Sequence, residues 1–452
     1  MRPRGGVVTQ RTANPCSAGS NPARGLHPIN KSESGAAKSR NSAQAGTSEM
    51  HPNRDDAQSG GGLSRAATLT FAAAAGLSVA NTYYAQPLLD AIAADFGIWP
   101  ATVGLVVTLT QIGYGLGLIF IVPLGDLVDR RKLILGQGIL SVIALVSIAM
   151  ARSEAILFAS LAAMGLMAVV IQILVAFAAT LASPQERGKT VGLVTSGIVI
   201  GILGARSIAG LLADLGGWRM VYLISAVLTL GMVGLLLRVL PRQSSPTGSD
   251  GYLAVIRSTP TLFLHDRILL VRGVLALLIF AAFSTFWTAL VLPLSAAPFS
   301  YSHTQIGLFG LIGLTGAIAA TGAGRLADRG LGQWTTGLSL IFLLVSWGLI
   351  ALLPVSIPAL LVGVILLDLA VQAVHVTNQS IIFERHPEAR SRLVGGYMVF
   401  YSLGSGVGAI TSTMVFAHSG WLGVSALGAT FSLFAFLVWF GTRRLSSSER
   451  KR

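Results

Sequence analysis

The sequence predicts an all-α polytopic membrane protein with 12 transmembrane helices in two pseudo-symmetric six-helix halves. The first observation is composition: 53% of the 452 residues are hydrophobic and only 11% are charged, whereas soluble domains carry about 25% charged residues. The second is that long apolar runs recur along the chain, each sufficient to cross the roughly 30 Å core of a bilayer. The third is an internal repeat that divides these runs into two similar sets.

Residues 1–65 form a polar N-terminal tail that is rich in Ser, Gly, Asn and Arg. Such a composition does not bury enough apolar surface to order itself, so we expect a disordered cytoplasmic tail. The tail contains no apolar segment of the kind that a secretory signal requires. Met50 is an alternative start that would remove most of it.

Twelve apolar spans follow, and a polar connection separates them into two halves. The first half, 66–239, holds the spans 66–89, 102–124, 133–151, 155–182, 190–213 and 218–239. The predicted cytoplasmic linker, 240–268, contains the polar stretch PRQSSPTGSDG. The second half, 269–442, holds the spans 269–292, 304–324, 332–353, 357–383, 392–416 and 420–441, and a basic tail, 443–452, follows.

Positive charge is concentrated in alternate loops and in the two tails. Of the 32 Lys and Arg residues, 29 lie in the tails and the even-numbered loops. The odd-numbered loops hold only Arg152 and Arg219, and Arg206 falls inside the fifth span. The positive-inside rule therefore predicts a multi-pass protein of the bacterial cytoplasmic (inner) membrane with both termini cytoplasmic. Because topology explains the net charge of +14, we expect no nucleic-acid partner.

Short sequences recur at nearly constant offsets in the two halves. GDLVD at 125–129 returns as GRLAD at 324–328, and PQERGKTVG at 184–192 returns as PEARSRLVG at 387–395. Gln172 in the fourth span corresponds to Gln372 in the tenth. Two six-helix halves in parallel orientation are typical of transporters whose substrate site lies between the halves, near the middle of the membrane.

The stretch PLGDLVDRRKLIL, after the second span, resembles the loop signature G-x-L-x-D-R-x-G-R-[RK] of the major facilitator superfamily. It departs from that signature where the second glycine is missing, so that Arg131 and Lys132 close the motif early. With the twelve spans, the resemblance covers essentially 66–445, and it indicates the fold rather than the substrate. The matching positions in the two copies are Gly125, Leu127, Asp129 and Arg130, and Gly324, Leu326, Asp328, Arg329 and Gly330.

The motif suits a gate that forms in one conformation and breaks in the other. Gly125 would allow two helices to approach closely. Asp129 would accept backbone N–H groups at the N-terminus of a neighbouring helix, where negative charge is favoured. Arg130 would hold that carboxylate in place. The alternative is that these charges only anchor the loop at the lipid headgroups.

The fifth span combines glycines suited to close helix packing across the moving interface with one arginine. Proton antiporters of the superfamily carry G-x-x-x-G-P-x-x-G-G here, but Ile202 replaces the proline, and Ala205 and Arg206 replace the last glycines. Their R-x-x-Q-G motif in the fourth span has Leu161 at the arginine position. An arginine at this depth costs about 2.5–3.5 kcal/mol, so it faces a cavity or a partner. Its role would be substrate or proton handling, or a structural ion pair.

The tenth span carries one polar stripe, because Asp368, Gln372, His375 and Gln379 recur at helical spacing. The tenth helix lines the cavity in the superfamily, which implies that this stripe faces the translocation path. Asp368 has a depth similar to that of Arg206, so we expect a pair that exchanges a proton when rocking separates it. His375 would relay the proton. The alternative is a static hydrogen-bonded network that holds this span.

Aromatic and amide side chains form a weaker candidate site for the substrate. Asn81 and Tyr84, in NTYYAQPLL at the end of the first span, would line the outer part of the cavity, as first helices do in the superfamily. Tyr397 and Tyr401 in the eleventh span would form an aromatic wall with Phe286 and Trp287 in the seventh. The alternatives are an interfacial aromatic belt and ordinary packing.

The leading hypothesis is a secondary active transporter that moves a small organic molecule by alternating access and couples its efflux to protons. The sequence has no Walker pattern for ATP, so a gradient would supply the energy. NTYYAQPLL and DLAVQAVHVTNQ resemble segments of bacterial members near the drug and sugar exporters, and a monomer is the superfamily's usual state.

The alternatives are an ion-independent facilitator and, behind it, a membrane-embedded enzyme or a sensor. We expect no catalytic residue, cofactor or metal. The lone cysteine, Cys16, excludes internal disulfides and cysteine-rich metal sites.

Overall fold

The computed structural model describes residues 64–183, 185–241, 251–313, 316, 322–385 and 390–443. The chain divides into two compact units, Met1–Ser59 and Gly60–Arg452, and all described residues belong to the second. The predicted tails, 1–65 and 443–452, therefore lie almost entirely outside the described residues. Within those residues every regular element is a helix, which confirms the predicted all-α membrane fold.

The first six predicted spans fold as helices, and two of them contain short irregularities. The fourth span is continuous in length, Glu154–Leu181, but consists of two helices in line. The elements are α1 (Arg65–Tyr83), η2 (Gln86–Leu88), α2 (Leu89–Phe96), α3 (Leu105–Phe120), η3 (Val122–Asp126), α4 (Arg130–Ala149), α5 (Glu154–Ala168), α6 (Val170–Leu181), α7 (Arg187–Gly216) and α8 (Trp218–Val239).

The second six spans are also helical where the structure describes them, and the last two join without a loop. In the eighth span, residues 314–315 and 317–321 lie outside the described residues. Gly420 has φ 59° and ψ −158°, a conformation open essentially to glycine alone, so α16 is two helices that meet at this residue. The elements are α10 (Arg267–Ala289), α11 (Val291–Ser295), α12 (His303–Ile312), η4 (Ala327–Leu331), α14 (Gly332–Ile350), α15 (Ile357–Arg385) and α16 (Arg390–Thr442).

The predicted polar linker contains a helix, α9 (Tyr252–His265), that composition alone does not indicate. The Tyr252 hydroxyl donates a hydrogen bond to the carbonyl of Phe120 at 2.7 Å, which fastens α9 to the end of α3. Asp266 then caps α10 by accepting the backbone N–H of Ile268 at 2.8 Å.

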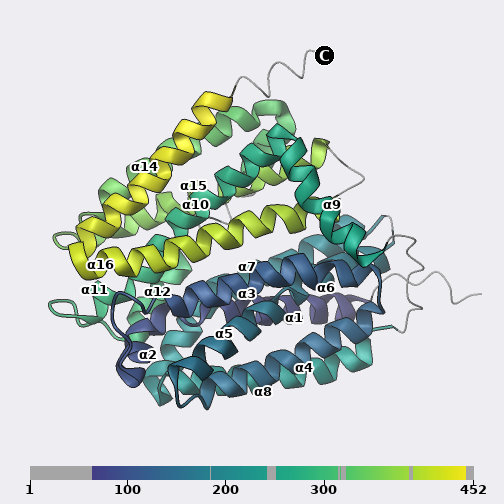
Figure 1. Cartoon of the computed structure of the whole chain (residues 1–452), viewed down its shortest axis with the longest axis horizontal. Coiled ribbons are helices and arrows are strands. Elements are labelled where there is room, and N and C mark those ends of the chain that lie inside the picture. The colour runs from purple at the N-terminus through teal and green to yellow at the C-terminus, as the bar shows by residue number, and fades with distance from the viewer. Residues whose placement is uncertain are drawn as a thin grey trace, which may run out of the picture. The chain divides into compact units, whose positions relative to one another are not determined.

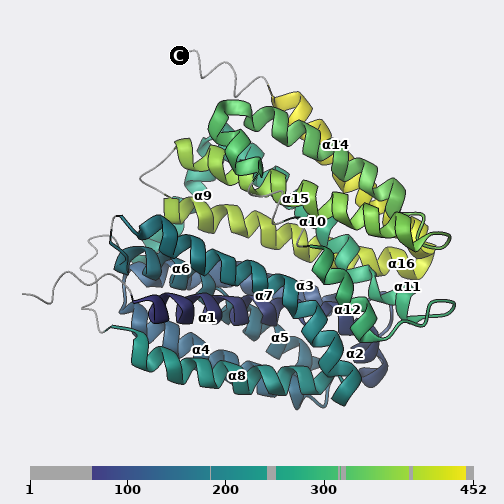
Figure 2. The same ribbon diagram turned by 180° about the vertical axis from the view of Figure 1, so that it is seen from behind.

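Helices α1–α8 and α10–α16 form two groups, which we call the N half and the C half (Figures 1 and 2). The halves face each other where α3 lies along α16 and α7 lies along α12. Glycines of the fifth span serve packing both within and between these groups. A Cβ on Gly197 would lie 2.2 Å from the carbonyl oxygen of Ala72 in α1, and one on Gly210 would lie 2.1 Å from that of His303 in α12.

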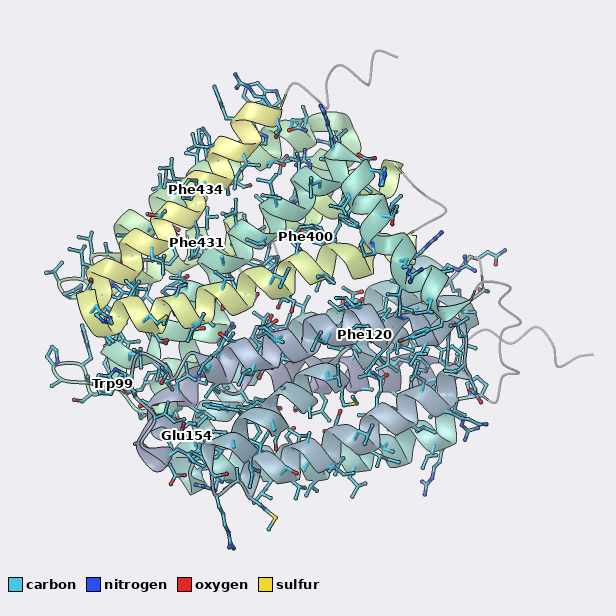
Figure 3. All side chains as sticks on the ribbon, in the orientation of Figure 1. Trp99, Phe120, Glu154, Phe400, Phe431 and Phe434 are labelled. Atoms are coloured by element: carbon cyan, nitrogen blue, oxygen red, sulfur yellow. The ribbon has the colours of Figure 1, made fainter. Side chains whose placement is uncertain are left out.

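The two ends of the helix bundle differ in charge. We call one end the acidic end because it carries Asp90, Asp95, Glu154 and Asp214, and the other the basic end because it carries Arg130, Arg131, Lys132 and Arg187. Figure 3 labels Trp99 and Glu154 at the acidic end and Phe120 toward the basic end.

Candidate functional site

Arg206, in α7, is buried where the two halves meet, with 3% of its surface exposed. Its Nε donates a hydrogen bond to Oε1 of Gln86 in the same half at 2.8 Å. Its guanidinium lies 3.9 Å from the ring centroid of Trp287 in α10 and 5.0 Å from that of Tyr83. The Nη2 atom has no hydrogen-bond partner among the described residues. A neutral amide and aromatic faces therefore hold this charge, an arrangement that cation–π attraction favours.

Asp368, in α15, is 4% exposed and lies at the edge of the same indole ring. Nε1 of Trp287 donates a hydrogen bond to Oδ1 of Asp368 at 3.2 Å. Helix α12 passes so close that a Cβ on Gly313 would lie 3.0 Å from Oδ2. Arg206 and Asp368 interact electrostatically but form no direct ion pair. The two residues that sequence analysis pairs are thus brought together through Trp287.

Trp287 belongs to a row of rings along one face of α10. Phe280 and Phe283 are 6.0 Å apart by ring centroids, and Phe283 and Trp287 are 6.2 Å apart. The ring of Tyr401 lies 4.2 Å from that of Phe280. The predicted aromatic wall therefore includes Trp287 and Tyr401, but it is completed by Phe280 and Phe283 rather than by Tyr397.

Tyr83 and Tyr401 join the halves through hydroxyls that lie 2.7 Å apart. The prediction that Asn81 and Tyr84 line the cavity differs from the structure, which places both against α8. Asn81 accepts a hydrogen bond from Ser225, and the Tyr84 ring packs in the same region. Because Asn81 and Tyr84 share one helix face, the rotation of α1 that buries them directs Tyr83 toward the C half.

Two of the three predicted glutamines, Gln172 and Gln372, lie next to residues around this site. Nε2 of Gln172, in α6, donates to the Tyr114 hydroxyl at 3.2 Å, and the Tyr114 ring lies 6.3 Å from Tyr401. Gln372 is partly buried, and a Cβ on Gly316 would lie 3.0 Å from its Cγ. Gln379 is also partly buried, and its side chain makes no hydrogen bond to the described residues.

His375 belongs to a second polar cluster, which lies inside the C half. Its Nδ1 lies 3.1 Å from the hydroxyl of Tyr397, and that hydroxyl lies 3.5 Å from Nδ2 of Asn378. Nη1 of Arg272 donates to Oδ1 of Asn378 at 3.1 Å and to Oγ1 of Thr336 at 3.3 Å. Tyr397, expected in the substrate wall, is 1% exposed within this cluster.

Arg272 is a buried charge that the predicted topology overlooks. The count of positive loop charges includes it, although it lies within the predicted span 269–292, and the structure buries it in α10 with 2% of its surface exposed. The signal was present in ILLVRGVLALL, where one arginine stands among apolar residues as Arg206 does. In the described part of the chain no carboxylate lies within ion-pair distance of Arg272, and no cluster of three or more His, Cys, Asp or Glu could hold a metal.

At the acidic end, His303 of the C half lies between two carboxylates of the N half. Its Nε2 is 3.1 Å from Asp90 and its Nδ1 is 3.1 Å from Asp214. Asp214 also accepts the backbone N–H of Thr304 at 2.8 Å, which caps α12 across the interface. The hydrogen bond to Asp90 and the charges of both carboxylates raise the pKa of His303, although partial burial opposes them.

Among the described residues, the first copy of the loop motif forms hydrogen bonds within the N half. Asp129 caps its own helix, α4, by accepting the backbone N–H of Arg131 at 2.9 Å, rather than a neighbouring helix. Arg130 donates to the carbonyl of Gly125 at 2.8 Å and to the Thr180 hydroxyl at 2.9 Å. A Cβ on Gly125 would lie 3.7 Å from Ile173, so no close helix approach requires this glycine.

The second copy has a different backbone. It forms a π-helical turn, η4, in which Gly330 has a left-handed φ of 78°. A Cβ on Gly324 would meet Val376 at 3.7 Å, an ordinary contact. Arg329 is exposed, and the side chain of Asp328 lies outside the described residues.

The twin halves and the two loop copies agree with the comparison to known families. The profile of the Major Facilitator Superfamily matches residues 71–354 and 272–452. The chain belongs to the major facilitator superfamily. Within this superfamily it is 46% identical over 378 residues to the "Uncharacterized transporter YgaY" of Escherichia coli O157:H7, a match that covers 84% of this chain and 96% of that protein.

Two further similarities are weaker. A "Probable sugar efflux transporter" of Pasteurella multocida is 22% identical over 288 residues, which cover 60% of this chain and 68% of that protein. A bacterial homolog of the human lysosomal transporter Spinster, solved in an inward-facing and unoccupied conformation, matches with a TM-score of 0.71 at 14% identity. That match covers 84% of this chain and 96% of that structure, and it shows the shared fold.

Proposed function

We propose that this superfamily member exports a small organic molecule by alternating access and couples export to protons. The observation that carries the proposal is that Arg206 and Asp368 come from opposite halves and contact the same tryptophan, Trp287. A charge pair shared between two halves changes its separation whenever they rock. Its charge state can therefore follow the conformation.

In the structure, burial disfavours the charged form of Asp368, whereas the Arg206 guanidinium and the Trp287 N–H favour it. If the halves separated at this level, Asp368 would remain with Trp287 in the C half and Arg206 would leave with the N half. A buried carboxylate without its counter-charge is costly, and binding a proton removes that cost. One proton would then be taken up in one state and released in the other.

Other residues have supporting roles in this proposal. His375 lies two turns from Asp368 on α15, where a proton relay would run, and Gln372, Gln379 and Gln172 would contact the cargo. We propose that the two loop motifs bias the conformational equilibrium. The basic end would face the cytoplasm, and the protein would act as a monomer in the bacterial inner membrane. The similarity to a sugar efflux transporter supports export.

The alternative is a facilitator that moves its substrate without ions. The degraded antiporter motifs favour this alternative, because Leu161 and Ile202 occupy positions where antiporters carry arginine and proline. A facilitator would equilibrate its substrate but would never move it uphill.

The test is substrate-induced proton movement in everted membrane vesicles, with a panel of dyes, antibiotics and sugars. Wild type would be compared with Asp368→Asn, which keeps the size of the side chain and removes its charge. Glu154→Gln is the control, because Glu154 is an exposed carboxylate at the acidic end. Amounts of folded protein would be matched by size-exclusion profile.

We expect at least one compound to dissipate the pH gradient with wild type and Glu154→Gln but not with Asp368→Asn. Equal proton movement in Asp368→Asn would refute the assignment of Asp368 as the coupling group. Substrate equilibration without proton movement in wild type would establish the facilitator instead.

A further inference from the structure

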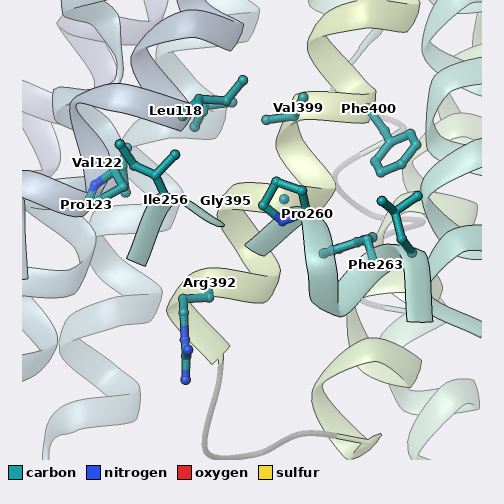
Figure 4. A pocket seen from close by; sticks show the side chains of 13 residues that line it. Leu118, Val122, Pro123, Ile256, Pro260, Phe263, Arg392, Gly395, Val399 and Phe400 are labelled. Carbon is teal, nitrogen blue, oxygen red and sulfur yellow. The ribbon is translucent and has the colours of Figure 1, made fainter. Parts of the chain in front are cut away.

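An apolar cavity of about 260 Å³ lies at the basic end, between the two halves and the linker helix (Figure 4). Leu118 and Val122 line it from the N half, Val399 from the C half and Ile256 from α9. Among the described residues that line it, Arg392 is the one that carries a charge. Its volume is close to the lower limit, about 300 Å³, of pockets that hold small ligands.

Helix α9 is fixed to both halves and forms the third wall of the cavity. Its Phe263 is 3% exposed, and the Phe263 ring lies 5.6 Å from that of Phe400 in α16. At its other end, Tyr252 is bonded to Phe120 of the N half. A ligand in the cavity would therefore touch the N half, the linker and the C half at once.

The cavity lies next to the central site, with one layer of packed side chains between them. Leu118 belongs to the same packed cluster as Tyr114, and Val399 and Tyr401 pack against that cluster. Tyr401 is in turn hydrogen-bonded to Tyr83, which lies against Arg206. One layer of aromatic side chains thus separates the cavity from the Arg206–Trp287–Asp368 site.

The charge at the edge of the cavity indicates which kind of ligand the cavity would bind. Arg392 is exposed at the edge of the cavity, and Figure 4 shows its guanidinium directed away from the apolar side chains. An apolar chamber with a cationic edge complements a molecule that has an apolar body and an anionic group.

We propose that this cavity is the first binding site of the cargo on the basic side, and that the cargo is an amphipathic anion. The apolar body occupies the cavity and the anionic group lies near Arg392. This inference rests on the proposed function, because it takes the cargo to approach from the basic end and to continue to the central site.

The experiment measures binding of two fluorescent probes to the purified full-length protein in nanodiscs of neutral phosphatidylcholine, without a pH gradient. Anilinonaphthalene sulfonate is anionic, and phenylnaphthylamine is a neutral molecule with nearly the same rings. Gly395→Leu adds an apolar side chain at a residue that lines the cavity and where an added Cβ meets nothing within 4 Å. Arg392→Gln removes the charge at the edge.

We expect Gly395→Leu to weaken both probes about tenfold or more, since a filled pocket excludes the apolar body. Arg392→Gln should weaken only the anionic probe, by about tenfold. Export of the anionic probe from cells should fall in parallel. Gly231→Leu is the matched control, because Gly231 is exposed in α8 and also meets nothing within 4 Å.

Unchanged binding in Gly395→Leu, or equal loss of both probes in Arg392→Gln, would overturn the proposal. So would displacement of both probes by anionic phosphatidylglycerol, which would identify the occupant as a lipid. Asp368→Asn should retain probe binding while losing proton-coupled export. Probe binding therefore tests the cavity, and proton-coupled export tests the coupling role of Asp368, so the two proposals can fail separately.

Discussion

Arg206 and Arg272 are both buried arginines, 3% and 2% exposed, but their partners differ in where they come from. The hydrogen-bond acceptors of Arg272, Thr336 and Asn378, belong to the C half, as Arg272 itself does. Arg206 belongs to the N half and stacks on Trp287 of the C half. An arginine whose partners share its half stabilises that half. An arginine that bridges the halves changes its contacts when the halves move relative to each other.

The largest expected effect is on transport by Arg206→Gln. We expect uphill export to fall about 100-fold or more, because hydrogen bonds to charged groups contribute about 1.5–3 kcal/mol each and a coupled pair would be lost. Initial export rates per amount of protein would measure it. Arg206→Lys should be intermediate, since lysine keeps the charge but not the planar stack. Export at the wild-type rate in Arg206→Gln would remove the distinction between the two arginines.

Arg272→Gln should show the opposite pattern. Loss of the guanidinium leaves Asn378 and Thr336 without their donor, which costs about 1–3 kcal/mol per buried unsatisfied group. We expect a lower unfolding temperature and normal export per folded molecule. Thermal unfolding in detergent and transport in vesicles measure the two quantities. A large loss of transport with unchanged unfolding would place Arg272 in the coupling machinery.

Trp287→Phe should have a smaller effect than the loss of Arg206. The phenyl ring still stacks on Arg206, but the N–H donated to Asp368 is gone, so we expect about a tenfold loss of export and a displaced pH profile. Trp347→Phe is the matched control, because Trp347 is 1% exposed and its Nε1 has no hydrogen-bond partner in the part of the chain that the structure describes. Identical pH profiles of wild type and Trp287→Phe would show that the indole N–H does not position Asp368.

The smallest expected effect concerns pH at the acidic end. Because the folded-state pKa of His303 is raised above 6.5, its bridge to Asp90 and Asp214 is fully formed below that pH and weakens as pH rises through the raised pKa. An ion pair at such a partly exposed site contributes at most about 1 kcal/mol, or a fivefold change in population.

Spin labels on Trp99→Cys and Val355→Cys, in a Cys16→Ser background, would measure this change. Both positions are exposed, by 71% and 81%, and they report the N half and the C half. We expect the population with a short distance between the two labels to decrease as pH rises. In His303→Gln this population should no longer depend on pH. A pH response that persists in His303→Gln would assign the titration to another group.

The sequence was sufficient to predict the all-α membrane fold, because hydropathy and the internal repeat record which segments cross a bilayer. It also identified Arg206 and Asp368, since the cost of burying a charge is evident from its apolar neighbours. Both inferences depend only on residues that are close together in the chain.

The orientation of each helix could not be predicted in the same way. Asn81 and Tyr84 were assigned to the cavity and Tyr83 was not, because the rotation of α1 is set by packing against α7 and α8. The role of Trp287 between Arg206 and Asp368 depends on three helices at once. Arg272 could have been recognised by the argument that found Arg206.

Gly420 makes the last two transmembrane helices rotationally locked to each other. The chain passes from the first of these helices to the second at a single residue. Each residue inserted there would therefore turn the following helix by about 100°. Trp421 would then lose its hydrogen bond to the Ile350 carbonyl, now 2.8 Å long. The chain between Tyr401 and Trp421 is therefore fixed in length, and this junction is where we expect epitope insertions and natural length variation to be rejected.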